Sequence, residues 1–195
     1  MITKRQMLEL IQNRLSGGDT PNDYRRLYPL PVISRVLNFA FADLVTRRPD
    51  LAIDMALPYT FDVESNTSGY YVTLDPQPIA GSMAIFNVED EGQNFYNVQS
   101  KQMAKEIRIM RGSNKDAAIY DTNRLLFNKQ PQGDVTVIMV PNVYQMNDND
   151  VLIANSDADG RGEMALFGLC LQVLQTREFQ DDLNNNSIDA QYGRG

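Results

Sequence analysis

The residues that could carry chemistry in this chain are carboxylates, because histidine is absent and Cys170 is the one cysteine. Without histidine, the Ser-His-Asp and Cys-His catalytic arrangements are missing, and so is the usual general base at neutral pH. One cysteine and no histidine also exclude an ordinary zinc site, which takes its ligands mainly from those two residue types. The composition therefore predicts a protein that is not an enzyme and that uses no cofactor and no metal.

One segment imitates the opening of a calcium-binding EF-hand loop. Residues 155–160, Asn-Ser-Asp-Ala-Asp-Gly, place oxygen ligands at alternate positions and glycine at the sixth. The twelfth position of such a loop should be a bidentate glutamate, but it is Leu166. We expect a polar turn in which Asp157 or Asp159 caps the following helix, and an ion site is the alternative.

Two clusters of carboxylates, at residues 89–91 and 181–182, are dense enough for the acid/base pair of a glycosidase. Both clusters lie in or beside expected turns or helix ends. We therefore expect solvated side chains at these positions rather than a catalytic pair.

The hydrophobic pattern predicts an α+β fold with N-terminal helices, a central antiparallel β-rich region, and a C-terminal helix with an extended tail. Apolar residues recur at helical spacing in three segments, residues 4–16, 31–48 and 160–179. Thr3 and Gln6 have the spacing of a capping box ahead of the first helix. We expect residues 1–183 to form one domain and residues 184–195, which have no core-forming pattern, to form the tail.

The β-rich region spans about residues 57–140, where short β-branched and aromatic runs alternate with turn residues. Residues 117–127 predict a tight hairpin that turns at 121–123. Residues 65–69 form one of the turn-rich breaks, and residues 101–111 fit either a short helix or a strand. The expected strands are residues 60–63, 70–74, 83–88, 95–98, 117–120, 124–127 and 135–140.

The net charge of −7 is spread unevenly along the chain. Residues 1–48 carry +4, residues 49–100 carry −8, residues 101–133 carry +4, and residues 134–195 carry −7. Solvated faces and helix-end charges are the ordinary explanation of such blocks. The alternative is head-to-tail self-association, in which the basic surface of one copy meets the acidic surface of the next.

The order of elements and two stretches of sequence resemble a known family. Residues 2–18 are similar to the N-termini of structural proteins of Bacteroidetes phages. The passage from residues 125–127 through 135–141 to the helix at 163–179 resembles the end of phage adaptor proteins. Across most of its length the chain resembles the head–tail connector proteins of tailed bacteriophages. The likeness is to the adaptor or ring proteins below the portal in short-tailed phages, including crAss-like phages.

This resemblance implies a structural protein of the virion neck, made in the cytoplasm of the bacterial host. About twelve copies would form a ring that joins capsid to tail, extends the portal channel and helps to retain DNA. Its partners would be its own copies, the portal protein, further neck or tail proteins and packaged DNA, with no membrane. The alternatives are a soluble binding module or assembly chaperone for another virion protein, and a small enzyme that uses carboxylates.

Six side chains are candidate interface residues under this hypothesis. Arg47 and Arg48 end the second helix, and basic residues in the block 101–133 would line a DNA channel. An aromatic residue in the tail would anchor it on a neighbouring subunit, because aromatic residues are enriched at interface cores. The candidates are Arg47, Arg48, Lys101, Lys105, Arg108 and Tyr192.

Overall fold

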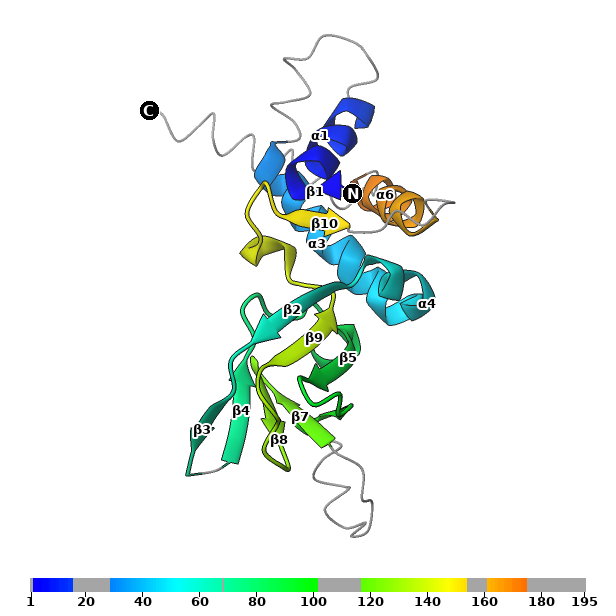
Figure 1. Ribbon diagram of the computed structural model, residues 1–195. Helices are drawn as coiled ribbons and strands as arrows, with labels where there is room; N and C mark the ends of the chain where they lie inside the picture. The colour runs from blue at the N-terminus through cyan, green and yellow to red at the C-terminus, as the bar shows by residue number, and fades with distance from the viewer. Residues whose placement is uncertain (1, 16–28, 68, 102–116, 154–160, 175–195) are drawn as a thin grey trace, which may run out of the picture.

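The computed structural model describes residues 2–15, 29–67, 69–101, 117–153 and 161–174. Figure 1 shows the helices gathered at one end of an elongated molecule and the two larger sheets at the other. We call these the helical part and the sheet part. The described chain enters the sheet part at Leu57 and leaves it after Met139, and the predicted α+β class is confirmed.

The helices follow the predicted positions closely. The first two predicted helices agree with the structure to within one residue at each end, and the third begins at Arg161. The last turn expected for the third helix, and the tail, lie outside the described residues. The α-helices are α1 (Lys4–Leu15), α3 (Leu30–Arg47), α4 (Pro49–Ala52) and α6 (Arg161–Leu174). The 3-10 turns are η1 (Ile53–Met55), η2 (Gly81–Ala84) and η3 (Val143–Gln145).

Helix α3 runs through the middle of the helical part, where α1, α4, α6 and η3 contact it. Its apolar side chains recur at helical spacing, so one broad face of the helix is removed from water. Pro49 follows the helix and stops it, because a proline lacks the N–H that the next turn requires. The buried residues of α3 are Ile33, Ser34, Val36, Leu37, Ala40, Phe41, Leu44 and Val45.

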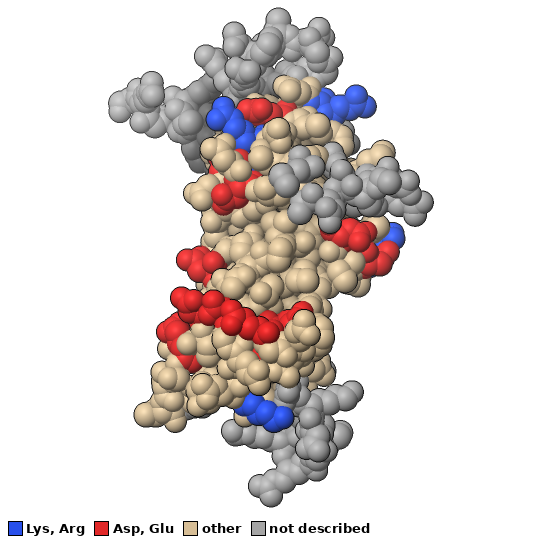
Figure 2. All heavy atoms as spheres, viewed as in Figure 1, with Lys and Arg blue, Asp and Glu red and all other residues tan. Residues whose placement is uncertain are grey.

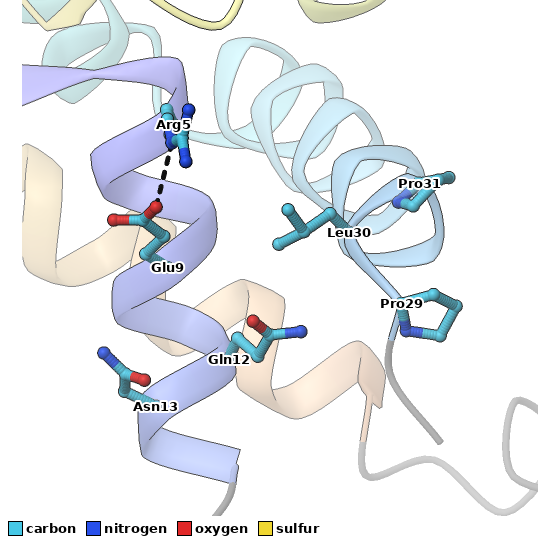
Figure 3. Close-up of a pocket in the computed structure, with 7 residues that line it drawn as sticks. All are labelled: Arg5, Glu9, Gln12, Asn13, Pro29, Leu30 and Pro31. Atoms are coloured by element: carbon cyan, nitrogen blue, oxygen red, sulfur yellow. Dashed lines mark hydrogen bonds and ion pairs between the residues drawn. The ribbon is translucent and has the colours of Figure 1, made fainter. Parts of the chain in front are cut away.

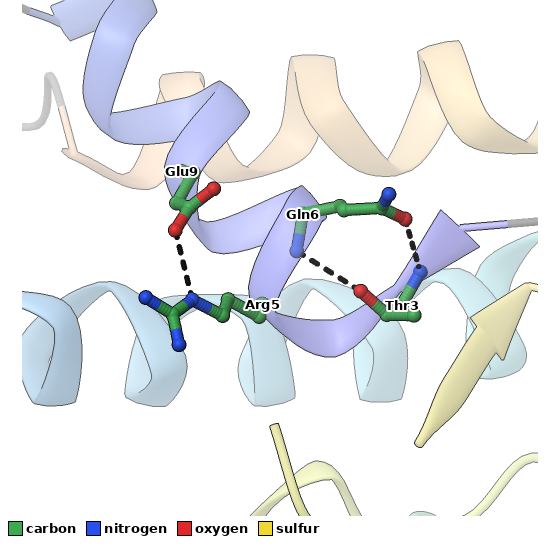
Figure 4. Close-up of polar contacts among 4 residues, drawn as sticks. All are labelled: Thr3, Arg5, Gln6 and Glu9. Atoms are coloured by element: carbon green, nitrogen blue, oxygen red, sulfur yellow. Dashed lines mark hydrogen bonds and ion pairs between the residues drawn. The ribbon is translucent and has the colours of Figure 1, made fainter. Parts of the chain in front are cut away.

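The start of α1 is held by the capping box that the sequence predicts (Figure 4). The Thr3 N–H donates to Gln6 Oε1 at 2.9 Å, and the Gln6 N–H donates to Thr3 Oγ1 at 3.3 Å. The next N–H groups, of Lys4 and Arg5, donate to the carbonyls of residues 150 and 148 at 3.0 and 2.9 Å. The free donors of the first turn are thus satisfied by distant backbone as well as by the cap.

A two-stranded sheet also joins the residues before α1 to residues 151–153. Strand β1 (Ile2–Thr3) pairs antiparallel with β10 (Val151–Ile153). The sequence did not predict either strand. Strands of two and three residues leave too short a pattern to detect, and only the tertiary pairing defines them.

Three antiparallel strands form the first sheet of the sheet part, in the order β2 (Leu57–Phe61), β9 (Val135–Met139) and β5 (Ile85–Asp90). In β9, Val135, Val137 and Met139 are buried and the residues between them are half-buried. This alternation defines an inner face toward the second sheet and an outer face away from it.

Five strands form the second sheet. The predicted hairpin at residues 117–127 is confirmed, and its turn lies between β7 and β8. The neighbours β6 and β7 are parallel, which differs from the expected antiparallel pairing. The connection over residues 101–116 is long enough for the crossover that parallel strands require. In order, the strands are β3 (Glu64–Asn66), β4 (Gly69–Thr73), β8 (Arg124–Phe127), β7 (Ala117–Asp121) and β6 (Asn97–Ser100).

The two sheets enclose one hydrophobic cluster between their inner faces. The five-stranded sheet contributes Val72, Leu125 and Phe127, and the three-stranded sheet contributes Val88 and Val137.

Three predicted details of this region are wrong. Part of the break expected at 65–69 is β3, the expected strand at 83–88 begins as the turn η2, and that at 95–98 begins two residues later. Pairing with β4 makes β3 a strand despite its polar residues.

The buried carboxylate of Asp90 joins the turn that follows β5 to the loop that precedes β9. Asp90, at the end of β5, is 4% exposed and accepts hydrogen bonds from the Gln132 N–H at 2.9 Å and the Tyr96 hydroxyl at 2.8 Å. The Asn94 N–H also donates to it at 3.0 Å, and the Asn94 side-chain amide reaches both carboxylate oxygens. Burial opposes the ionisation of Asp90, but these hydrogen bonds outweigh it and hold the pKa of the carboxyl well below its usual range.

We expect Asp90→Ala to lower the free energy of unfolding by about 3 kcal/mol, because it leaves several buried donors without an acceptor. The pKa of Asp90 is depressed in the folded state, so its contribution is complete above the unfolded pKa of about 4 and is lost as the pH falls below that value. Urea unfolding of both proteins, from neutral pH to about pH 2.5, should therefore show a difference that shrinks with acid. The exposed Asp54→Ala is the matched control, and an equal loss in both variants would contradict the assignment.

Candidate interaction surfaces

Four carboxylates lie together where the three-stranded sheet ends. The register places Thr60 opposite Thr136 and Thr136 opposite Glu89 on the outer face. Asp62 and Glu91 directly follow β2 and β5, Asp134 directly precedes β9, and the Glu91 N–H donates to the Asp134 carbonyl at 3.2 Å. We call the resulting set, Asp62, Glu89, Glu91 and Asp134, the acidic row. Figure 2 shows acidic side chains as a red belt across the sheet part.

The acidic row lacks an internal counterion among the residues that the structure describes. The described part of the chain forms the salt bridges Arg5–Glu9, Arg47–Asp43, Arg48–Asp50 and Lys101–Asp121. None of them includes a member of the acidic row. Like charges held side by side repel one another, and a basic partner would relieve that repulsion. The row therefore has the electrostatic character of a docking surface for a cationic group.

The expectation that residues 89–91 form a solvated turn is wrong for Asp90. The strand β5 extends through Asp90, and alternation along the strand turns its side chain inward while Glu89 faces outward. The hydrogen-bonded Asp90 carboxylate holds the backbone on which Glu89 and Glu91 are carried. The sequence shows an acidic residue on either side of Asp90 and no local pattern that sets it apart, so the buried carboxylate was missed.

The basic residues that the sequence singled out do not form one surface in the structure. Arg47 Nε lies 2.7 Å from Asp43 Oδ1 on the last turns of α3, and Arg48 makes a two-pronged contact with Asp50 at 2.8 and 3.0 Å. Lys101 Nζ, directly after β6, lies 2.6 Å from Asp121 Oδ2. Lys105, Arg108 and Tyr192 lie outside the described residues, as does the ion-site candidate at residues 155–160.

Arg47 and Arg48 make different contacts, and only Arg48 links two helices. The Arg48 N–H donates to the Leu44 carbonyl at 2.7 Å, and its guanidinium holds Asp50 at the start of α4, so Arg48 joins two helices. The Arg47 side chain is 76% exposed, and its ion pair with Asp43 uses Nε alone. Arg47 is thus the better placed of the two for an external partner.

A shallow apolar groove beside Arg47 was not predicted. It has a volume of about 600 Å³ and lies between α3 and α6. Phe39, which is 61% exposed, stands at its edge, and an exposed aromatic residue of this size is a common anchor of protein interfaces. The lining residues are Phe39, Ala40, Ala42, Asp43, Thr46, Arg47, Leu169 and Gln172.

A second hollow, of about 730 Å³, lies between α1 and the start of α3 (Figure 3). Helix α1 contributes Arg5, Glu9, Gln12 and Asn13, and the segment 29–31 contributes two prolines and a leucine. Arg5 Nε is bound to Glu9 Oε1 at 2.9 Å, so the two charges of the hollow neutralise each other. It is a polar cleft without a pair of groups arranged for proton transfer among its described lining residues.

Two further kinds of site are missing from the residues that the structure describes. No group of three or more Cys, Asp or Glu side chains in these ranges could hold a metal ion. No helix within them is long and apolar enough to cross a lipid bilayer.

No protein-family model matches the chain, and no curated protein sequence matches it significantly.

Cys170 lies inside the helical part on α6 and has no exposed surface. Burial raises the pKa of its thiol to about 12, so the reactive thiolate is scarce at neutral pH. We expect the native protein to resist a thiol-specific reagent at pH 8 and to react fully once unfolded in urea. A Phe39→Cys variant, with an exposed thiol, is the positive control, and rapid labelling of the native wild-type protein would contradict the expectation.

Proposed function

We propose that this chain is a structural protein of a phage virion that assembles head to tail into a ring of about twelve copies. The ring would lie in the neck between portal and tail, where it joins capsid to tail and extends the DNA channel. The proposal combines the resemblance of the sequence to connector proteins with the surfaces described above.

One observation supports the proposal most directly: the acidic row and the exposed arginines lie on different parts of the same chain. The acidic row belongs to the sheet part and has no cation of the described residues paired with it. Exposed arginines, Arg35 and Arg47, lie on α3 in the helical part. Opposite charges on two separate surfaces favour contact between successive copies, because such a contact is heterologous and can close into a ring.

The mass of the purified full-length protein, measured by light scattering with and without the portal protein of the same phage, tests this function. We expect a closed oligomer of about a dozen copies, alone or on the portal, because each copy carries both halves of the contact. Electron microscopy of the same samples should show rings. A chain that remains monomeric in both samples would overturn the proposal and favour a soluble binding module or assembly chaperone.

Salt should weaken the assembly if exposed charges hold it together. The Debye length falls from about 10 Å at 0.1 M salt to about 3 Å at 1 M, so attraction between the two surfaces is screened. We expect the concentration needed for half-assembly to rise at least about tenfold over this range. Light scattering at several salt concentrations measures it, and stronger assembly at high salt would show that apolar contacts dominate.

A further inference from the structure

One side of α3 combines charge with an exposed aromatic residue. Arg35 and Phe39 are one helical turn apart, Arg47 lies at the end of the same helix, and all three are exposed. The Arg35 guanidinium has no ion pair with a described residue. The apolar groove lies directly beside Phe39. We call Arg35, Phe39 and Arg47 the α3 stripe; it has the arginine and aromatic composition typical of interface hot spots.

The outer face of the three-stranded sheet has the opposite character. The outward residues of β2 and β9 include Pro58, Thr60, Thr136 and Ile138, which are uncharged and at least partly exposed. The acidic row borders them, and in Figure 2 the red belt runs along an uncharged area of the sheet part. This face offers apolar atoms for an aromatic ring and carboxylates for two flanking arginines.

We infer that the α3 stripe of one copy docks on the outer face of the β2–β9–β5 sheet of the next copy. Phe39 would lie against the uncharged residues around Thr60 and Ile138, while Arg35 and Arg47 pair with the acidic row. The occupant is a second copy because both complementary halves occur in the same chain, on different parts of it. This inference rests on the proposed function and names the contact by which that assembly forms.

A pair of charge-reversal variants tests the contact, under the conditions in which the wild-type chain assembles. The first variant, Arg35→Glu with Arg47→Glu, removes the stripe but keeps the sheet face. The second, Asp62→Lys with Asp134→Lys, removes the sheet face but keeps the stripe. We expect each variant alone to lose at least about tenfold in assembly, since both replace attraction by repulsion.

The mixture of the two variants is the decisive sample. The intact sheet face of the first variant attracts the intact stripe of the second, and the two reversed surfaces also attract each other, so the mixture should form alternating oligomers that neither variant forms alone. A mixture that forms no complex, or variants that assemble like the wild type, would overturn this contact while the wild-type oligomer still supports the ring. A wild-type chain that never assembles overturns both proposals.

Phe39→Asp disrupts the centre of the stripe, and Met83→Asp is its matched control. Met83 is 58% exposed and lies on η2, outside the stripe, so its replacement by aspartate changes charge and apolar surface to a similar degree. We expect Phe39→Asp to reduce assembly at least about tenfold and Met83→Asp to leave it unchanged. Urea unfolding of both variants checks that the fold is intact. Equal assembly by the two variants would contradict the role of Phe39.

Discussion

The burial of α3 is the constraint on which the rest of the structure depends. Eight of its eighteen residues are buried, and α1, α4, α6 and η3 all contact it. A helix enclosed in this way must hold its apolar side chains in one register, because interiors are close-packed. The remaining side of α3 is consequently fixed in direction, and it carries Arg35 and Phe39, while Arg47 is exposed at the end of the helix. The core of the helical part thus determines where the exposed surface of α3 points.

A polar constraint of the same kind operates in the sheet part. Asp90 has no cation beside it among the described residues and is stabilised by N–H and O–H donors from Asn94, Tyr96 and Gln132. A charge buried in this way remains ionised and holds two connections together, since each donor would lose its acceptor if the turn opened. The neighbouring carboxylates Glu89 and Glu91 face outward from a rigid backbone. One carboxylate serves the fold, and those beside it are available for partners.

The sequence predicted the parts of the fold that local patterns encode. Helical spacing located α1 and α3, the Thr3 and Gln6 spacing identified the cap, and turn residues located the β7–β8 hairpin. Features that depend on tertiary pairing were missed, including the strands β1 and β10 and the parallel pair β6–β7. The acidic row belongs to the same group, because Glu89 lies on β5, the other members lie at the ends of three strands, and only the register of those strands brings them together.

The pairing of Leu57 with Met139 has a consequence for how this chain can vary. Leu57 opens the sheet part, Met139 closes it, and the two residues lie opposite each other on adjacent strands. The segment 57–139 therefore begins and ends at nearly one point. The same segment returns to the helical part midway, where Ala84 belongs to the core that α3 forms and the Ile79 N–H donates to the Val140 carbonyl at 3.0 Å. Changes of length are therefore tolerated best in the turns at the far end of the two sheets, which can vary without moving the helices.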